Sequence, residues 1–197
     1  MSDKLEKCAC KGGRIFLPGI AIFLIASLAF LPAALAASAA EIDGDVALAL
    51  DKLYARSPAA KTLSNDAKGI LVFPNIVKGG LIIGGQYGEG ALLSKGKTDG
   101  YYKSVAASYG LQAGAQSFGY ALFFMKENDL NYLKNSEGWE VGVGPSIVIV
   151  DEKMAAATSL TTTTGRDHIY AFFFSQKGLM AGIGLQGTKT TRFYPKK

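Results

Sequence analysis

Glycines alternate with apolar residues along Phe73–Leu93, and this pattern predicts the central part of a β-sheet. Four of these glycines share one parity, so on a regular strand they would all lie on one face of the sheet. Glycine weakens a strand unless a close neighbour requires the missing side chain. We therefore expect a glycine-lined face pressed against a neighbouring element. The four glycines are Gly80, Gly84, Gly88 and Gly90.

The same pattern returns later in the chain and predicts further strands. It recurs in Ser108–Phe124, Trp139–Val150 and Gly178–Gly187. Within the second of these, Ser146–Val150 is apolar on both faces, which is typical of a central strand covered on each side. Ile169–Phe174 and Leu179–Leu185 read as two strands joined by a hairpin turn at Ser175–Gly178.

Two shorter signals predict where strands begin and end. Ile70–Phe73 is a short apolar strand that we expect to end at Pro74, because proline cannot donate a ladder hydrogen bond. Thr98–Gly100 reads as a turn before the strand Tyr101–Ala107.

Helical spacing appears in three segments. Glu41–Arg56 places apolar residues three and four positions apart, which predicts an amphipathic helix. A second helix begins at Pro58, is capped by Ser57 and runs to about Lys68, and a third covers Lys126–Ser136. The predicted fold is α+β: a largely antiparallel, glycine-rich sheet or partly closed barrel of about seven or eight strands with about three helices.

The first 36 residues have the pattern of a secretory signal peptide. Basic residues precede the uncharged apolar run Ile15–Leu31, and small residues follow it at Ala34 and Ala36. We expect cleavage after Ala36, with Ala39 as a second position, and a single domain over residues 40–195. An uncleaved anchor stays open as an alternative, although the apolar run is short for a hydrocarbon layer of about 30 Å.

Cleavage would change the composition of the mature chain. It removes both cysteines, and it removes four basic and two acidic residues, so the net charge falls from +5 to +3. We expect an exported protein that is periplasmic or associated with the cell envelope. A mildly basic charge is compatible with an anionic membrane, and the absence of a dense Lys/Arg stripe gives no reason to expect nucleic acid.

The sequence contains partial matches to catalytic and cofactor-binding motifs, but the surrounding residues do not meet the structural requirements of these motifs. Gly182–Gly187 matches a dinucleotide-binding pattern, but no helix or acidic residue follows at the required distance. Ser108, Asp151 or Asp167, and His168 follow the order of a hydrolase triad, but the segment after Ser108 reads as strand rather than helix. One histidine and scattered carboxylates form no metal-ligand cluster. We expect no enzyme, no cofactor and no metal.

The run Ala67–Leu93 resembles the SYLF domain family, and three later runs extend the resemblance. The resemblance implies a lipid-binding module without catalytic residues. Eukaryotic members of the family bind phosphoinositide-containing membranes and some bind actin, which a bacterial exported chain would not be expected to meet. We expect no accompanying SH3 or FYVE domain that would recruit a protein partner. The later runs are SYGLQAGAQSFGYALFFM, GWEVGVGPSIVIVD and AFFFSQKGLMAGIGLQGTK.

The leading functional hypothesis is a lipid-binding domain that acts at an anionic phospholipid membrane surface. Two kinds of residue could contact lipid: basic residues that meet phosphate headgroups, and the apolar face of the first helix. The alternative for these residues is that the helix face packs on the sheet and the lysines are solvated. The alternative function is a structural or protein-interaction module of the envelope. The lipid-binding candidates are Lys68, Lys78, Lys189, Arg192, Leu50, Leu53 and Tyr54.

Overall fold

The computed structural model describes residues 37–80, 83–109, 114–140, 145–150, 169–178 and 187–196, with the side chains of Ser108 and Tyr109 left out. Residues 36–197 form one compact unit by themselves. The predicted signal peptide, the strand Leu179–Leu185, Asp151, Asp167 and His168 lie outside the described residues, as does most of Gly182–Gly187.

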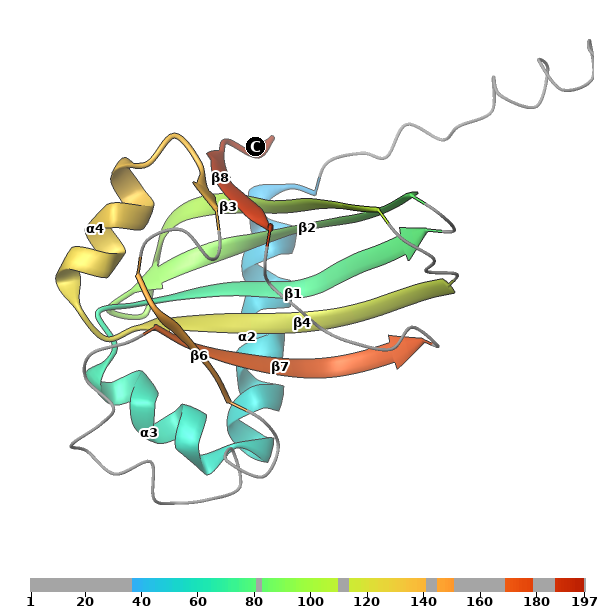
Figure 1. Cartoon of the computed structure of the whole chain (residues 1–197). Coiled ribbons are helices and arrows are strands. Elements are labelled where there is room, and N and C mark those ends of the chain that lie inside the picture. Colours follow the sequence, from blue (N-terminus) through green and yellow to red (C-terminus); the bar gives the residue numbers. More distant parts are fainter. Residues whose placement is uncertain are drawn as a thin grey trace, which may run out of the picture. The chain divides into compact units, whose positions relative to one another are not determined.

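The described elements are an eight-stranded sheet and three helices (Figure 1). The strand order is β5-β8-β3-β2-β1-β4-β7-β6, and every neighbouring pair is antiparallel except β6 and β7. The sheet is strongly curled and only partly closed, so the predicted α+β class is confirmed. The elements are α2 (Ala39–Arg56), α3 (Pro58–Asp66), β1 (Gly69–Gly80), β2 (Ile83–Ser94), β3 (Lys97–Tyr109), β4 (Gly114–Phe124), α4 (Glu127–Asn135), β5 (Trp139–Glu140), β6 (Ile147–Val150), β7 (Ile169–Gly178) and β8 (Lys189–Phe193).

Helix α2 begins at a complete capping box. The Ser38 hydroxyl accepts a hydrogen bond from the Glu41 N–H, and the Glu41 carboxylate accepts one from the Ser38 N–H at 2.8 Å. These bonds satisfy donors that a helix start would otherwise leave without partners. The Ala39 N–H also donates to the carbonyl oxygen of Lys196 at 3.2 Å, so both ends of the described unit lie side by side.

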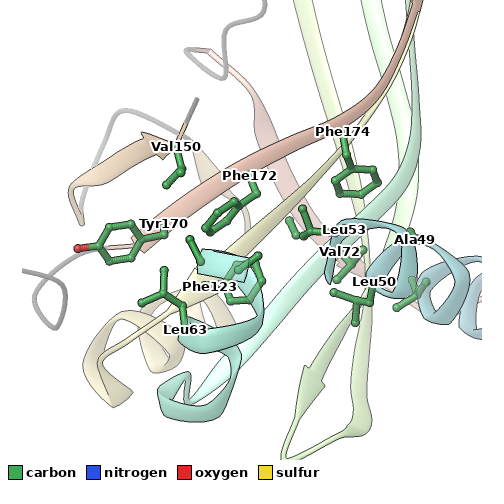
Figure 2. Packing of buried hydrophobic residues seen from close by; sticks show 14 of the residues in the cluster. Ala49, Leu50, Leu53, Leu63, Val72, Phe123, Val150, Tyr170, Phe172 and Phe174 are labelled. Atoms are coloured by element: carbon green, nitrogen blue, oxygen red, sulfur yellow. The ribbon is translucent and has the colours of Figure 1, made fainter. Parts of the chain in front are cut away.

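The apolar face of α2 is buried against the sheet. Figure 1 shows the helix crossing the strands on one face, and the predicted spacing of its apolar residues is confirmed. The side chains of α2 and α3 pack with residues from β1, β2, β4 and β7 in one hydrophobic cluster (Figure 2). The buried residues of α2 are Ile42, Val46, Ala49, Leu50 and Leu53.

A second cluster fills the opposite face of the sheet. It contains Phe73, Phe124 and Trp139, together with Leu130 and Leu133 from α4. Because both faces are covered at this end of the sheet, the middle strands β1 and β4 are apolar on both sides there.

Pro74 does not end a strand, so that prediction is wrong. β1 continues through Pro74 to Gly80 by means of a β-bulge, which adds one residue relative to both neighbours. The pairing shifts between Val72 and Asn75 against β2, and between Phe73 and Ile76 against β4. A bulge is one of the few places where a sheet tolerates proline, because the extra residue makes no ladder hydrogen bond.

Glycines on both neighbouring strands make room for this bulge. A Cβ atom on Gly88 of β2 would lie 2.7 Å from the Asn75 carbonyl oxygen, and one on Gly119 of β4 would lie 2.7 Å from the Pro74 carbonyl oxygen. A Cβ atom on Gly90 would overlap the carbonyl oxygen of Val72. β1 of the same sheet therefore approaches all three glycines, and the Phe174 ring of β7 also approaches Gly119.

Three other predictions are corrected by the structure. The segment Ser146–Val150 was expected in the centre, but β6 lies at the end of the strand order and Ile149 is exposed. The turn lies at Lys95 and Gly96, which both have positive φ, so Thr98–Gly100 is already part of β3. Ser175–Gly178 belongs to β7 rather than to a turn.

The bulge predicts that alanine substitutions at two glycines of β2 differ strongly in their effect on stability. Gly90→Ala should lower the free energy of unfolding by about 1–3 kcal/mol, because the new methyl group meets backbone atoms that cannot move away cheaply. Gly85→Ala is the matched control, since the nearest atom to its Cβ would be the Ala106 carbonyl oxygen at 3.9 Å. Urea unfolding of both variants measures the difference, and equal stabilities would contradict the close packing at the bulge.

The packing of α2 on the sheet predicts that alanine substitutions at a buried and an exposed leucine of this helix differ in their effect on stability. Leu50→Ala should cost about 2–5 kcal/mol, because it leaves a cavity between the helix and the sheet. Leu48→Ala removes the same atoms from an exposed position and should change stability by about 0.5 kcal/mol or less. If the two variants unfold at the same urea concentration, α2 is held only loosely and its apolar face is free to leave the sheet.

Candidate functional site

A pocket of about 970 Å³ opens where the end of α2, the bulge of β1 and the strand β7 meet. Its walls come from segments far apart in the sequence, so no single stretch of sequence encodes it. The residues that line it are Lys52, Leu53, Arg56, Ser57, Pro74, Asn75, Ser117, Val150, Phe172, Phe173, Phe174, Ser175, Gln176 and Lys177.

Ser57 fixes the helical side of the pocket. Its N–H donates to the Leu53 carbonyl oxygen at 2.8 Å, which ends α2. Its hydroxyl accepts from the Ala60 N–H at 3.1 Å, which begins α3 with Pro58 in the first turn. One residue therefore serves both helices, and this tight junction holds the last turn of α2 at the rim.

The floor of the pocket is apolar. Leu53, Val150, Phe172 and Phe174 are all buried and belong to the cluster beneath α2. Figure 2 shows the rings of Phe172 and Phe174 projecting from β7 toward the helices. A ligand in this pocket would therefore meet hydrocarbon below it.

The rim of the pocket is basic. Lys52 and Arg56 lie one helical turn apart on α2, and Lys177 faces them from β7. All three side chains are exposed, and the lining residues that the structure describes include no aspartate or glutamate. Basic groups above an apolar floor suit a ligand that combines an anionic group with an apolar part.

Among the described residues that line the pocket there is no histidine, cysteine or carboxylate, and the Ser57 hydroxyl accepts the hydrogen bond that caps α3. Within the described residues, no group of three potential metal ligands comes together. Nor does any helix in this part of the chain have the length and apolar character needed to cross a membrane.

The structure places the apolar candidate residues inside the molecule. Leu50 and Leu53 are buried under α2, and Tyr54 packs against the same cluster, where burial raises the pKa of its phenol. Leu53 also lines the pocket, so it is the one apolar candidate that a bound ligand could reach. Contact of Leu50 or Tyr54 with lipid would require α2 to leave the sheet, and their lipid-binding role stays a prediction.

The four basic candidates do not gather into one site. Lys68 is exposed before β1, where its N–H donates to the Phe124 carbonyl oxygen at 2.8 Å, and Lys78 lies near the other end of the same strand. Arg192 donates to the Asp99 carbonyl oxygen at 3.1 Å, and its guanidinium lies 6.0 Å from the centre of the Tyr194 ring. Lys189 is exposed on β8, opposite Val105.

Sequence reasoning missed the three cations of the pocket. Lys52 and Arg56 lie near the end of the predicted helix and were not among the candidates, although their spacing of four places them on one side. Lys177 fell in the segment expected to be a turn. No local signal links β7 to α2, because the pocket forms only when the sheet is assembled.

Comparison with known families identifies the second half of the domain. Residues 105–193 match the family Ysc84, described as "Las17-binding protein actin regulator". The match begins within β3 and extends to the end of β8, so it includes the β7 wall of the pocket but not α2 or the bulge of β1. The comparison with curated proteins gave no match. Residues 105–193 of this chain therefore match the Ysc84 (SYLF) family model, in agreement with the resemblance found in the sequence.

Proposed function

We propose that this chain is a non-catalytic module that binds anionic lipid at a membrane surface, with the headgroup in the pocket. The observation that carries the proposal is the pocket itself, in which three exposed cations stand above a floor of buried aromatic and aliphatic side chains. Membership of a family associated with lipid and actin binding supports a binding function.

Both electrostatic attraction and apolar contact would contribute to lipid binding. Each lysine or arginine near an anionic membrane surface contributes about 1 kcal/mol of attraction. The apolar floor contributes through the surface that a ligand's hydrocarbon removes from water. The described residues of the lining carry three cations and no carboxylate, and this charge balance favours a phosphate group.

Vesicle co-sedimentation with a charge-matched pair of variants tests the proposal. The first variant, K52Q/R56Q/K177Q, removes the three cations of the rim. The control, K61Q/K95Q/K97Q, removes three exposed lysines elsewhere and leaves the same net charge. The rim variant should bind phosphatidylglycerol vesicles about a hundredfold more weakly than the parent, from about 1 kcal/mol per cation.

The control variant distinguishes binding at the pocket from general attraction between the net charge of the protein and the membrane. It should retain most of the binding, and added salt should weaken the binding of the parent without abolishing it. Equal losses in the two variants would show that net charge alone drives binding. A parent protein that sediments with neither neutral nor anionic vesicles would contradict lipid binding altogether.

Export to the periplasm or envelope is part of the same proposal, and the cap of α2 predicts the cleavage position. Cleavage after Ala36 keeps Ser38, its capping box and its contact with Lys196. Cleavage after Ala39 would remove them, at a cost of about 1 kcal/mol for the cap alone. Mass spectrometry of envelope fractions should find a chain that begins at Ala37. An intact Met1–Gly13 segment, or a chain beginning at Ala40, would contradict this prediction.

A second candidate function is recognition of a protein in the cell envelope. The observation in its favour is the match to a family described as a protein-binding actin regulator. An exported chain would not meet actin, so a partner would have to be another envelope protein. The vesicle experiment distinguishes the two functions, because a protein-interaction module need not sediment with lipid.

A further inference from the structure

Six side chains form one row across the sheet on the face that α2 crosses. Register places Ser117 beside Val77, Val77 beside Tyr87, and Tyr87 beside Val105. Tyr87 has the same parity as Ala91, which packs in the cluster beneath α2, and this fixes the face. Lys177 pairs with Ser117 at one end of the row, and Lys189 pairs with Val105 at the other.

The middle of this row is an exposed apolar surface. Val77, Tyr87 and Val105 keep 56%, 50% and 42% of their surface exposed, and Ile83 on the same face of β2 is also exposed. The next row outward contains only small residues in register, so no large side chain projects from it. We call these residues together the flat face: Val77, Gly79, Ile83, Gly85, Tyr87, Val105, Ala107 and Ala115.

The flat face can lose its water at little cost in hydrogen bonds. Val77, Gly79, Gly85, Tyr87 and Val105 each pair with a described residue on both neighbouring strands, whereas Ile83, Ala107 and Ala115 pair on one side. In the middle of the flat face the backbone N–H and C=O groups are therefore engaged in the sheet, as contact with hydrocarbon requires. Desolvation and the hydrogen bond to Glu89 raise the pKa of Tyr87 to about 12, so its phenol stays neutral at ordinary pH.

The charges around the flat face favour an anionic partner. Ser117 and Lys177 belong both to the row and to the pocket lining, so the flat face continues into the site with Lys52 and Arg56. Among the described strand residues, two carboxylates lie beside the row on this face. Glu89 accepts the Tyr87 hydroxyl at 2.5 Å and stands opposite Lys103, and Glu140 stands opposite Lys189. Each is therefore next to a lysine, while the described lining of the pocket places no acidic residue beside its cations.

From this arrangement we infer that the flat face is the surface on which an anionic bilayer docks. The lysines at both ends of the row match headgroup phosphates, and the apolar middle matches the layer beneath them. The inference rests on the proposed function and makes it more specific. The membrane contacts the sheet beside α2, while α2 itself stays docked.

One test places charges on the flat face and compares them with charges elsewhere. The variant V77E/V105E is matched by Y132E/I149E, which adds the same charge at positions that are 44% and 50% exposed. Tyr132 lies on α4, whose buried residues pack against the opposite face of the sheet. The flat-face variant should bind phosphatidylglycerol vesicles about tenfold more weakly than the control, or weaker still, because it buries charge in the contact. Equal binding by the two variants would overturn the inference.

A second test reports contact directly and does not depend on the stability of the charged variants. Residues 37–197 contain no cysteine, so V77C carries a single site for an environment-sensitive fluorophore. These residues include every described element of the compact unit. Emission from V77C should shift to the blue with vesicles that contain phosphatidylglycerol, and emission from Y132C should not.

The experiments distinguish failure of the docking face from failure of the proposed lipid binding. If the protein sediments with anionic vesicles while the label at V77C stays unchanged, the docking face is wrong and lipid binding stands. If the unlabelled parent does not sediment with them, the proposed function fails and the inference fails with it.

Discussion

A proline in the middle of a sheet is the constraint on which the rest of this structure depends. Pro74 has no N–H to donate, yet β1 pairs with β2 on one side and with β4 on the other. The bulge resolves this conflict by adding a residue that the ladders skip. It requires space on both neighbours, which glycines of β2 and β4 provide. The geometry of these three strands is therefore interdependent: the bulge in β1 requires the glycines of β2 and β4.

The bulge also decides which way the second half of β1 faces. Val72 packs beneath α2, and without the extra residue Val77 would point to the opposite side of the sheet. The inserted residue reverses the alternation, so that Val77 comes into line with Tyr87 and Val105. The same bulge brings Pro74 and Asn75 to the wall of the pocket. One local irregularity thus shapes both the pocket and the exposed surface beside it.

The sequence predicted those features that depend on neighbouring residues. The spacing of Ile42, Val46 and Leu53 identified α2 and its buried face, and the glycine pattern identified the strands. The predictions failed where distant segments decide the outcome. Pro74 reads as a strand end unless glycines about 15 and 45 positions away are known to flank it, and nothing within Ser146–Val150 reveals that it pairs only with β7 among the described strands. The pocket was missed for the same reason, and Lys189 is the basic candidate that joins the row.

The contact between Ser38 and Lys196 bears on how this domain can be attached to other structures. Because the described unit begins and ends at adjacent positions, a tether at either end would leave from the same corner of the sheet. A fusion partner would therefore be presented in the same way whether it were joined before α2 or after β8. The adjacent ends also make the fold a natural subject for circular permutation, since a short linker could close them and new ends could open at the exposed turn of Lys95 and Gly96.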